Sequence, residues 1–443
     1  MCARSGWVLY GTQLSPFALK LALALRASGR RFRWSWQLGV LRGHAQYEAR
    51  KALASAGLLR WHVPRQRSPL DELPLVPFLF GEDGSNCVDS SAIVAELALD
   101  AALPAPAAFV SLLVEELFDE VGLYLVHHHR WTQRANLDAW RGAEEQRASP
   151  GAYLFREEKY KSVPMPEALR AHLVSWFNAR QRRRLPYFLS THETRAALDQ
   201  WLERTVDAVE LVLADPAVAR APLDEQSLLW ALGSRAPCAA DASCFGQLNM
   251  LAHLNRGSRD EMSLRAPRTV DWLDAHQLAV QAHTGQPVSP LAATPRALPP
   301  APAPTPTPTP SARAGDARAG LAGLVSLARD LFVPLMKANE AAYEAYAGGE
   351  EGRWPAQQLF NEQAMWRHEA LFETRLLGTS VTSVAKTFQV PVWRRVKAAW
   401  SALTPEHRAC VEALGCEGLG EAILGPPPRL SLLSRNAPPG PRL

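Results

Sequence analysis

Cysteine is scarce in this sequence, and no two cysteines form a CxxC pair. The chain has 443 residues and six cysteines: Cys2, Cys87, Cys238, Cys244, Cys410 and Cys416. This scattering does not indicate a disulfide framework or a zinc site, and it argues against a dithiol redox enzyme. We expect reduced thiols, no metal and a cytoplasmic protein.

An excess of either charge and a long apolar run are also missing. Lys and Arg number 48 against 44 Asp and Glu, so the net charge of +4 does not indicate a nucleic-acid partner. The opening MCARSGWVLYG lacks the apolar segment of a signal peptide. No uninterrupted apolar run approaches the roughly 20 residues that span a bilayer. We therefore predict neither a nucleic-acid nor a membrane partner.

The densest basic run is RQRRR, at residues 180–184. A solvated helix end is its simpler interpretation, and a targeting or phosphate-binding patch is the alternative.

The first hundred residues alternate strand and helix patterns, which predicts an α/β domain over residues 1–103. A Gly-containing turn, EDGS, joins the last two strands as a hairpin. The expected elements are strand 7–10, helix 16–28, strand 32–38, strands 77–80 and 86–88, and helix 89–99.

Strand signals nearly vanish in the next part of the chain, where amphipathic helical patterns dominate. We assign residues 104–285 to an all-helical domain. The expected helices are 108–131, 166–183, 192–213, 224–232, 239–255 and 267–281.

The last third changes character twice. Residues 286–319 carry Pro-Ala and Pro-Thr repeats that cannot form a core, so we predict a disordered, semi-rigid linker. Residues 320–425 regain helical periodicity and predict a helical extension, kinked near Pro334. Residues 426–443 are Pro-rich and predict a disordered tail. The helices expected in the extension are 321–346, 361–377 and 392–403.

Three motifs, in order along the chain, together resemble the glutathione transferase family. LYGTQLSPFALKLALALRASG is similar to the first strand and helix of its serine-type classes. LVPFLF is similar to the Val-Pro before its third strand, and DSSAIVAEL is similar to the acidic-Ser motif that opens its third helix. The resemblance implies a thioredoxin-like first domain, an all-helical second domain and a possible homodimer.

Two later segments add to the resemblance. APCAADASCFGQL followed by RAPRTVDWLDA is similar to the family pattern P-S-x-x-D-x-x-x-x-G…P-x-V-x-x-W. Cys238 takes the helix-cap position where Ser or Thr is usual, with Asp241 three residues on, so half of the capping box is weakened. The final segment, from LFVPLMKANEAAYEAY to FQVPVWRRVKAAWSAL, looks like a tail found on some bacterial glutathione-transferase-like proteins. This likeness implies that the tail docks on the helical domain.

Ser15 stands where a helix begins, just before Pro16, so the local sequence predicts a helix N-cap. The resemblance implies that its hydroxyl also stabilises the thiolate of glutathione. A free thiol has a pKa of about 8.5, and both a helix N-terminus and a hydroxyl donor favour its ionised form. Ser15 is therefore the predicted catalytic residue, with the glutathione sulfur as the nucleophile. Tyr10 is another candidate donor, although core packing is its simpler interpretation.

Val76, Pro77, Asp89 and Ser90 are the predicted glutathione-binding residues. By the resemblance, the backbone before Pro77 pairs with the cysteinyl unit, and Ser90 with the first helix amides binds the γ-glutamyl carboxylate. Asp89 pairs with the γ-glutamyl ammonium. Both pairs also have a plainer interpretation. Val76-Pro77 can be an ordinary strand edge with a proline, and Asp89-Ser90 can be a helix cap.

One feature departs from the family pattern. Many relatives carry Lys or Arg just before the Val-Pro position, where this chain has LPL at residues 73–75. Arg65 and Arg67 are candidate substitutes in the preceding loop. The affinity for glutathione is in doubt for this reason.

The run His127–His129 does not predict a metal site, because adjacent histidines point to different helix faces. A helix surface near the domain interface is the simpler interpretation. In the family, the first helix of the helical domain lines the pocket for the electrophile. The resemblance therefore makes Tyr124, His128 and Trp131 candidate contacts of that substrate.

The predicted function is conjugation of the glutathione thiolate to an electrophilic small molecule, with glutathione as co-substrate. The alternative is a non-catalytic module of the same fold that binds partners or serves as a scaffold. The missing basic residue and the long linker favour that alternative.

Overall fold

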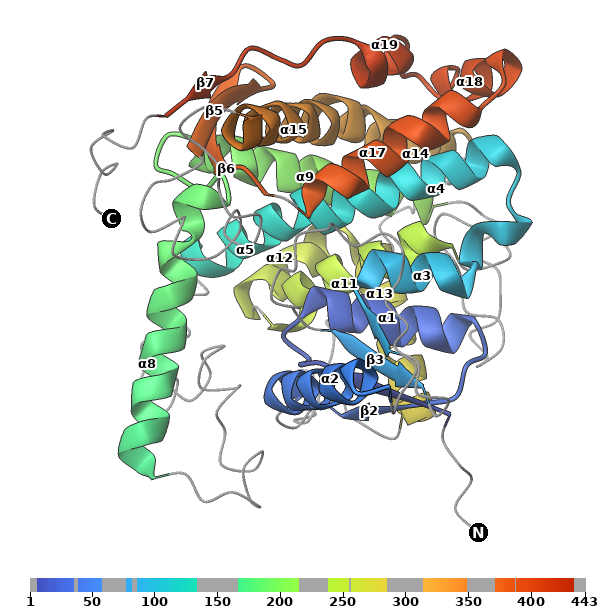
Figure 1. Ribbon diagram of the computed structural model, residues 1–443. Coiled ribbons are helices and arrows are strands. Elements are labelled where there is room, and N and C mark those ends of the chain that lie inside the picture. Colours follow the sequence, from blue (N-terminus) through green and yellow to red (C-terminus); the bar gives the residue numbers. More distant parts are fainter. Residues whose placement is uncertain are drawn as a thin grey trace, which may run out of the picture.

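The structure is a computed structural model of the chain, shown in Figure 1. The residues that it describes are 6–35, 39–57, 77–81, 86–133, 166–214, 238–254, 256–284, 314–348, 371–386 and 388–433. They form a mixed sheet flanked by helices, then a helical region, then a C-terminal region of helices with a second small sheet.

Four short strands form the N-terminal sheet, in the spatial order β2-β1-β3-β4. The central strand β1 pairs parallel to β2 and antiparallel to β3, and β3 pairs antiparallel to β4. The predicted layout of an α/β region followed by a helical region is confirmed at this coarse level. The strands are β1 (Trp7–Tyr10), β2 (Phe32–Ser35), β3 (Phe78–Gly81) and β4 (Asn86–Val88).

Apolar side chains cover both faces of this sheet, because successive strand residues point to opposite sides. Leu9 and Leu79 belong to the main core, which also contains the apolar residues of α1 from Ala18 to Leu25, so this helix is buried on all sides. Phe78 and Phe80 point the other way and pack with Tyr47 of α2. The flanking helices are α1 (Pro16–Ala27), α2 (Gly39–Ser55) and α3 (Ser90–Leu97), followed by the 3₁₀ turn η1 (Leu99–Ala102).

The central region is helical, as predicted. Its first helix runs without a break from Ala105 to Thr132, through α4 (Ala105–Glu116), the π-helical turn η2 (Leu117–Gly122) and α5 (Leu123–Thr132). The helix predicted over 224–232 lies outside the described residues. The remaining elements are α8 (Glu167–Arg183), the 3₁₀ turn η5 (Leu185–Tyr187), α9 (Arg195–Val212), α11 (Ala239–Leu254), α12 (Arg256–Arg265) and α13 (Pro267–Thr284).

The C-terminal region opens with a second long helix that contains a π turn. The π turn η6 ends just before Pro334, the residue at which the sequence predicts a kink. Proline lacks the N–H that would complete the regular ladder, which accounts for the irregular turn before it. The helix consists of α14 (Ala314–Leu327), η6 (Ala328–Phe332) and α15 (Val333–Gly348).

This helix packs closely on the helical region. A Cβ at Gly320 of α14 would lie 2.5 Å from the Ala208 carbonyl oxygen of α9, so the crossing requires glycine. Residues of the N-terminal, helical and C-terminal regions belong to one continuous hydrophobic core. The C-terminal region is therefore integrated into the body of the molecule.

The prediction of a helix over 361–377 is wrong for residues 371–376, which form strand β5 (Leu371–Leu376) of a hairpin with β6 (Thr379–Val384). Two residues, Leu377 and Gly378, make the turn, and both have positive φ (47° and 82°). This is the geometry of a type I′ hairpin turn, in which glycine is favoured. The same glycine read from sequence resembles the end of a helix, which explains the error.

The boundaries of the linker and the tail also need correction. Residues 314–319 belong to α14, and residues 286–313 lie outside the described residues. In the predicted tail, β7 (Ser431–Leu432) pairs antiparallel with β5, while residues 434–443 lie outside the described part. The other described elements of this region are the helices α17 (Gln389–Ala402), α18 (Pro405–Glu412) and α19 (Leu419–Leu424).

Among the described residues, one helix is long and apolar enough to cross a membrane. It covers Ala317–Ala345, and its most apolar window has a mean hydropathy of 1.5. That window is 56% buried inside the protein, as expected for a core helix, so length and composition alone do not decide between a soluble and a membrane location.

Candidate functional site

Three predicted site motifs follow one another around one end of the N-terminal sheet. In the strand register, Tyr10 pairs with Phe78, and Phe78 pairs with Val88. The end of β1, the start of β3 and the end of β4 therefore lie side by side. The residues just beyond them, Gly11, Pro77 and Asp89, share this end of the sheet. Val76 lies outside the described residues.

Ser15 is the N-cap of α1, as the sequence predicts. It has extended backbone angles (φ −96°, ψ 116°), and its Oγ accepts a hydrogen bond from the Ala18 amide at 3.3 Å. The side chain is buried, with 7% exposed. Because Oγ acts as the acceptor in the cap, its own hydrogen stays available for another partner. The role in thiolate stabilisation stays a prediction.

Pro77 lies next to the first turn of α1. A Cβ built on Gly11 would lie 3.8 Å from the Pro77 side chain and would overlap the Ala18 side chain. Gly11 therefore separates the start of β3 from the start of α1. This close approach requires a residue without a side chain at position 11.

Asp89 is the N-cap of α3, and its backbone is strained. Its φ of 76° is unusual for a residue other than glycine, and its Oδ1 accepts hydrogen bonds from the amides of Ser91 (3.0 Å) and Ala92 (3.3 Å). Ser90, the first residue of the helix, is buried. Strain of this kind is retained where the surroundings impose it and is frequent at functional sites.

A buried charge cluster, which the sequence analysis did not identify, lies beside this end of α1. Its four acids are on the continuous helix from α4 to η2: Glu115, Glu116, Asp119 and Glu120. All are buried. Their spacing of i, i+1, i+4 and i+5 forms one stripe on a helix. We call these residues and their cationic partners the acidic-stripe cluster.

Lys20 of α1 compensates part of the stripe. Its Nζ donates to Glu115 at 2.6 Å, to Asp119 at 2.5 Å and to the Ser91 hydroxyl of α3 at 3.1 Å. Burial opposes the charged form of Lys20, but the charges of Asp119 and Glu115 outweigh it and raise the pKa of Lys20. Ser243 of α11 also donates to Asp119.

Arg395 of α17 compensates the next acid. Its guanidinium donates to Glu116 and lies 3.7 Å from Glu115. Burial raises the pKa of both carboxyl groups, and the charge of Arg395 opposes that rise. The C-terminal region is therefore tied to the helical region by ionic contacts as well as by apolar packing.

Glu120, at the end of the stripe, lies in a network with the C-terminal region. Gln389 donates from Nε2 to Glu120 at 2.5 Å and to the Tyr124 hydroxyl at 3.0 Å. Lys386 donates to Ser383 at 3.1 Å, and its Nζ lies 4.7 Å from the centre of the Tyr124 ring. Burial raises the pKa of Glu120 to about 7 and lowers the pKa of Lys386 to about 7.

The predicted electrophile contacts are all buried. Tyr124, His128 and Trp131 are 1%, 0% and 4% exposed. Tyr124 is bonded to Gln389 as above, and His128 contacts the Ser190 hydroxyl at 2.7 Å and Asp199 at 3.2 Å. The interpretation of the histidine run as a helix surface is therefore wrong. Substrate contact by the three residues stays a prediction.

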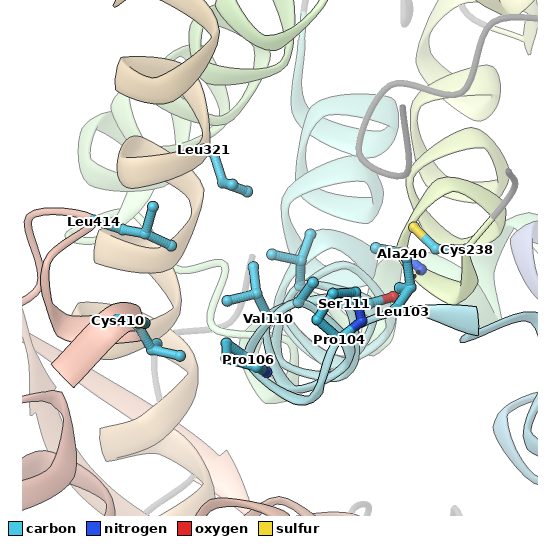
Figure 2. A pocket seen from close by; sticks show the side chains of 13 residues that line it. Leu103, Pro104, Pro106, Val110, Ser111, Cys238, Ala240, Leu321, Cys410 and Leu414 are labelled. Carbon is cyan, nitrogen blue, oxygen red and sulfur yellow. Dashed lines mark hydrogen bonds between the residues drawn. The ribbon is translucent and has the colours of Figure 1, made fainter. Parts of the chain in front are cut away.

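An apolar cavity of about 360 Å³ lies elsewhere, between the helical and C-terminal regions (Figure 2). Val110 and Ser111 of α4, Leu321 of α14 and Cys410 of α18 are among its lining residues. None of the predicted site residues lines it. Within the described residues, no group of three or more His, Cys, Asp or Glu side chains is arranged to hold a metal ion.

Comparison of the chain with known protein families, with curated proteins and with solved structures gives no match.

Proposed function

We propose that this chain is a glutathione transferase-like protein whose N-terminal domain has the thioredoxin-like fold. The observation that carries the proposal is the gathering of Ser15, Pro77, Asp89 and Ser90 around one end of a four-stranded mixed sheet. The strand order β2-β1-β3-β4, with only β1 and β2 parallel, is the order expected for that fold and supports the proposal.

In the proposed reaction, glutathione lies across this end of the sheet. The hydroxyl and the backbone amide of Ser90, the first residue of α3, bind its γ-glutamyl carboxylate, while the amides of Ser91 and Ala92 stay bonded to Asp89. The Ser15 hydroxyl donates its hydrogen to the glutathione sulfur, and the N-terminus of α1 adds its partial positive charge. The thiol proton leaves to solvent, and the thiolate attacks an electrophilic carbon and forms a carbon–sulfur bond. In a substitution, the bond from that carbon to its leaving group breaks and the leaving group departs with the electron pair. In an addition, the π electron pair moves to the neighbouring atom, which takes a proton from water.

The decisive experiment is titration of the purified protein with glutathione, followed by conjugation rates with a generic electrophile. We expect millimolar or tighter binding. The Ser15→Ala variant should lose about two orders of magnitude in rate, as expected when one preorganised donor is removed. Ser28→Ala is the matched control, because Ser28 ends the same helix and its hydroxyl donates to the Leu25 carbonyl at 2.9 Å. Binding with an unchanged Ser15→Ala rate would place thiolate stabilisation on another residue.

A non-catalytic binding module is the second candidate, and one observation favours it. The three candidate electrophile contacts are buried, and one of them is bonded to the C-terminal region through Gln389. No binding at millimolar glutathione would defeat the enzyme proposal and leave this candidate. Binding of glutathione with no turnover of any electrophile would also support it.

A further inference from the structure

The excess positive charge of the molecule is concentrated in one segment. Residues 166–184, which comprise α8 and its two flanking residues, hold five arginines and one glutamate. This net charge of +4 equals that of the whole chain, so the remainder is neutral overall. α8 has no buried residue and extends away from the body of the molecule (Figure 1).

The basic end of α8 meets the end of α5. His127 of α5 contacts the Gln181 carbonyl of α8 through Nε2 at 3.1 Å, and the Arg182 guanidinium lies 5.9 Å from the centre of the Trp131 ring. Both helices carry basic residues in their last turns. Cations are favoured at helix C-termini, which accounts for part of this pattern.

The preference for cations at helix C-termini explains why Arg130 lies in the last turn of α5, but it does not explain why part of its guanidinium is buried. Its Nε and Nη2 atoms are buried, and neither has a hydrogen-bond partner in the part of the chain that the structure describes. The side chain as a whole is half-buried, so it also reaches solvent. Burial lowers the pKa of Arg130 to about 10. Buried donors of a charged group are normally paired, because leaving them unpaired is costly.

A second guanidinium, that of Arg184, lies close enough with Arg130 to favour the neutral form of His127. Burial lowers the pKa of His127, and the charges of Arg130 and Arg184 lower it further. Burial and a neighbouring arginine lower the pKa of Arg184 to about 10. Asp199, an acid one helix away, is already bonded to His128. The junction of α5 and α8 thus presents several cations and one guanidinium with unmatched donors.

We propose that this junction binds a phosphate group, held by Arg130 and flanked by Arg180 and Arg184. The planar guanidinium presents paired donors that match two oxygens of a phosphate. A phosphate dianion also interacts more strongly than a single carboxylate with the two neighbouring guanidinium groups of Arg130 and Arg184. The ligand class is a phosphate or a phosphomonoester, either free in solution or on a lipid headgroup. The site is independent of the proposed glutathione site.

The test uses the full chain with inorganic phosphate and pyrophosphate as probes, measured by calorimetry and by the shift in melting temperature. We expect both to bind and to raise the melting temperature of the wild type. Arg130→Met should lower their affinity about tenfold or more. It should also fold at least as stably as the wild type in phosphate-free buffer, because it removes a buried charge that lacks a partner. That second result separates a binding role from a structural one.

Arg204→Gln is the matched control, because it removes an exposed arginine of α9 and should leave phosphate binding unchanged. Phosphatidylcholine vesicles with and without phosphatidic acid distinguish a lipid source from a free one. No binding of either probe, or equal binding by Arg130→Met, would overturn the proposal. So would binding of a single-stranded oligonucleotide that inorganic phosphate does not displace. If Arg130→Met fails to fold, Arg130→Lys, which keeps the charge but loses the paired donors, should still bind more weakly than the wild type.

Discussion

One continuous helix, from Ala105 to Thr132, carries two clusters of buried charge that differ in their balance. At the acidic-stripe cluster, cations and donors from α1, α3, α11 and α17 bond to all four acids, and Oε2 of Glu116 and Nε of Arg395 are the atoms of these pairs that have no partner among the described residues. Less than three turns further on, two buried nitrogens of Arg130 lack a partner among the described residues, and the described residues place no acid in contact with that guanidinium.

This contrast separates two uses of buried charge. A compensated cluster whose members come from distant segments holds those segments in register, because losing any one member leaves an unpaired charge inside the protein. The two buried nitrogens of Arg130 that lack a partner among the described residues make no such structural contribution, and an external anion is the group that would pair with them. The following variants test this distinction.

The largest effect should come from Lys20→Met. It leaves Glu115 and Asp119 buried without their cation, and removal of one partner from a buried pair costs about 3–5 kcal/mol. We expect the variant to unfold at much lower urea concentration than the wild type. Adding Glu115→Gln and Asp119→Asn to the same chain should restore a substantial part of the loss. A triple variant as unstable as the single one would show that Lys20 acts through packing.

The next effect depends on pH and concerns Glu120. Its folded pKa of about 7 lies above the ordinary 4.5, so the folded state holds the proton more tightly. The stability contributed by protonated Glu120 is therefore complete below pH 4.5 and is lost as the pH rises to 7. The wild type should lose about 2.5 kcal/mol of stability between pH 5 and pH 8 through this group, and Glu120→Gln should not show that loss. Urea unfolding at both pH values measures this, and a difference independent of pH would contradict it.

Arg395→Met should have a smaller effect, because part of this side chain (19%) is exposed and water screens the exposed part. We expect a loss of about 2 kcal/mol, since Glu116 is left buried and without its cation. Glu116→Gln in the same chain should recover most of the loss. Absence of that recovery would mean that the contact between α17 and α4 is held by apolar packing alone.

The smallest effect should come from Tyr124→Phe. It removes the hydroxyl that accepts from Gln389, a neutral hydrogen bond with a net contribution of about 1 kcal/mol. The same change in a Gln389→Leu background should have no further effect. An equal loss in both backgrounds would assign the effect to packing of the ring.

Local sequence patterns predicted the positions of most described helices and strands. They did not predict the clusters of buried charged residues. Pro16 after Ser15 indicated a helix start, and α1 begins there. The hairpin β5–β6 was missed because Gly378 is compatible with both a helix end and a turn. A lysine inside the apolar run PFALKLALAL was the available signal for the acidic-stripe cluster, since a buried lysine requires acids.

The sequence did not predict which charged residues pair within these clusters, because the partners are far apart along the chain. Lys20 and Asp119 are 99 residues apart, and Arg395 and Glu116 are 279 apart. No helical or strand periodicity relates residues at such separations. Of the predicted glutathione site, the two helix caps and their place at one end of the sheet follow from local signals and from strand order. The hydroxyl of buried Tyr124 accepts from Gln389, which lies 265 residues further along the chain, and no local pattern predicts such a contact.

The close crossing of α14 and α9 at Gly320 has a consequence for how the molecule can be assembled. Apolar contacts and the ion pair of Arg395 with Glu116 hold the C-terminal region on the helical region, and neither depends on the chain between Thr284 and Ala314 being continuous. We therefore expect two polypeptides, ending and beginning within that interval, to reassociate into the same structure. The C-terminal region would then behave as a subunit that happens to be encoded in the same chain.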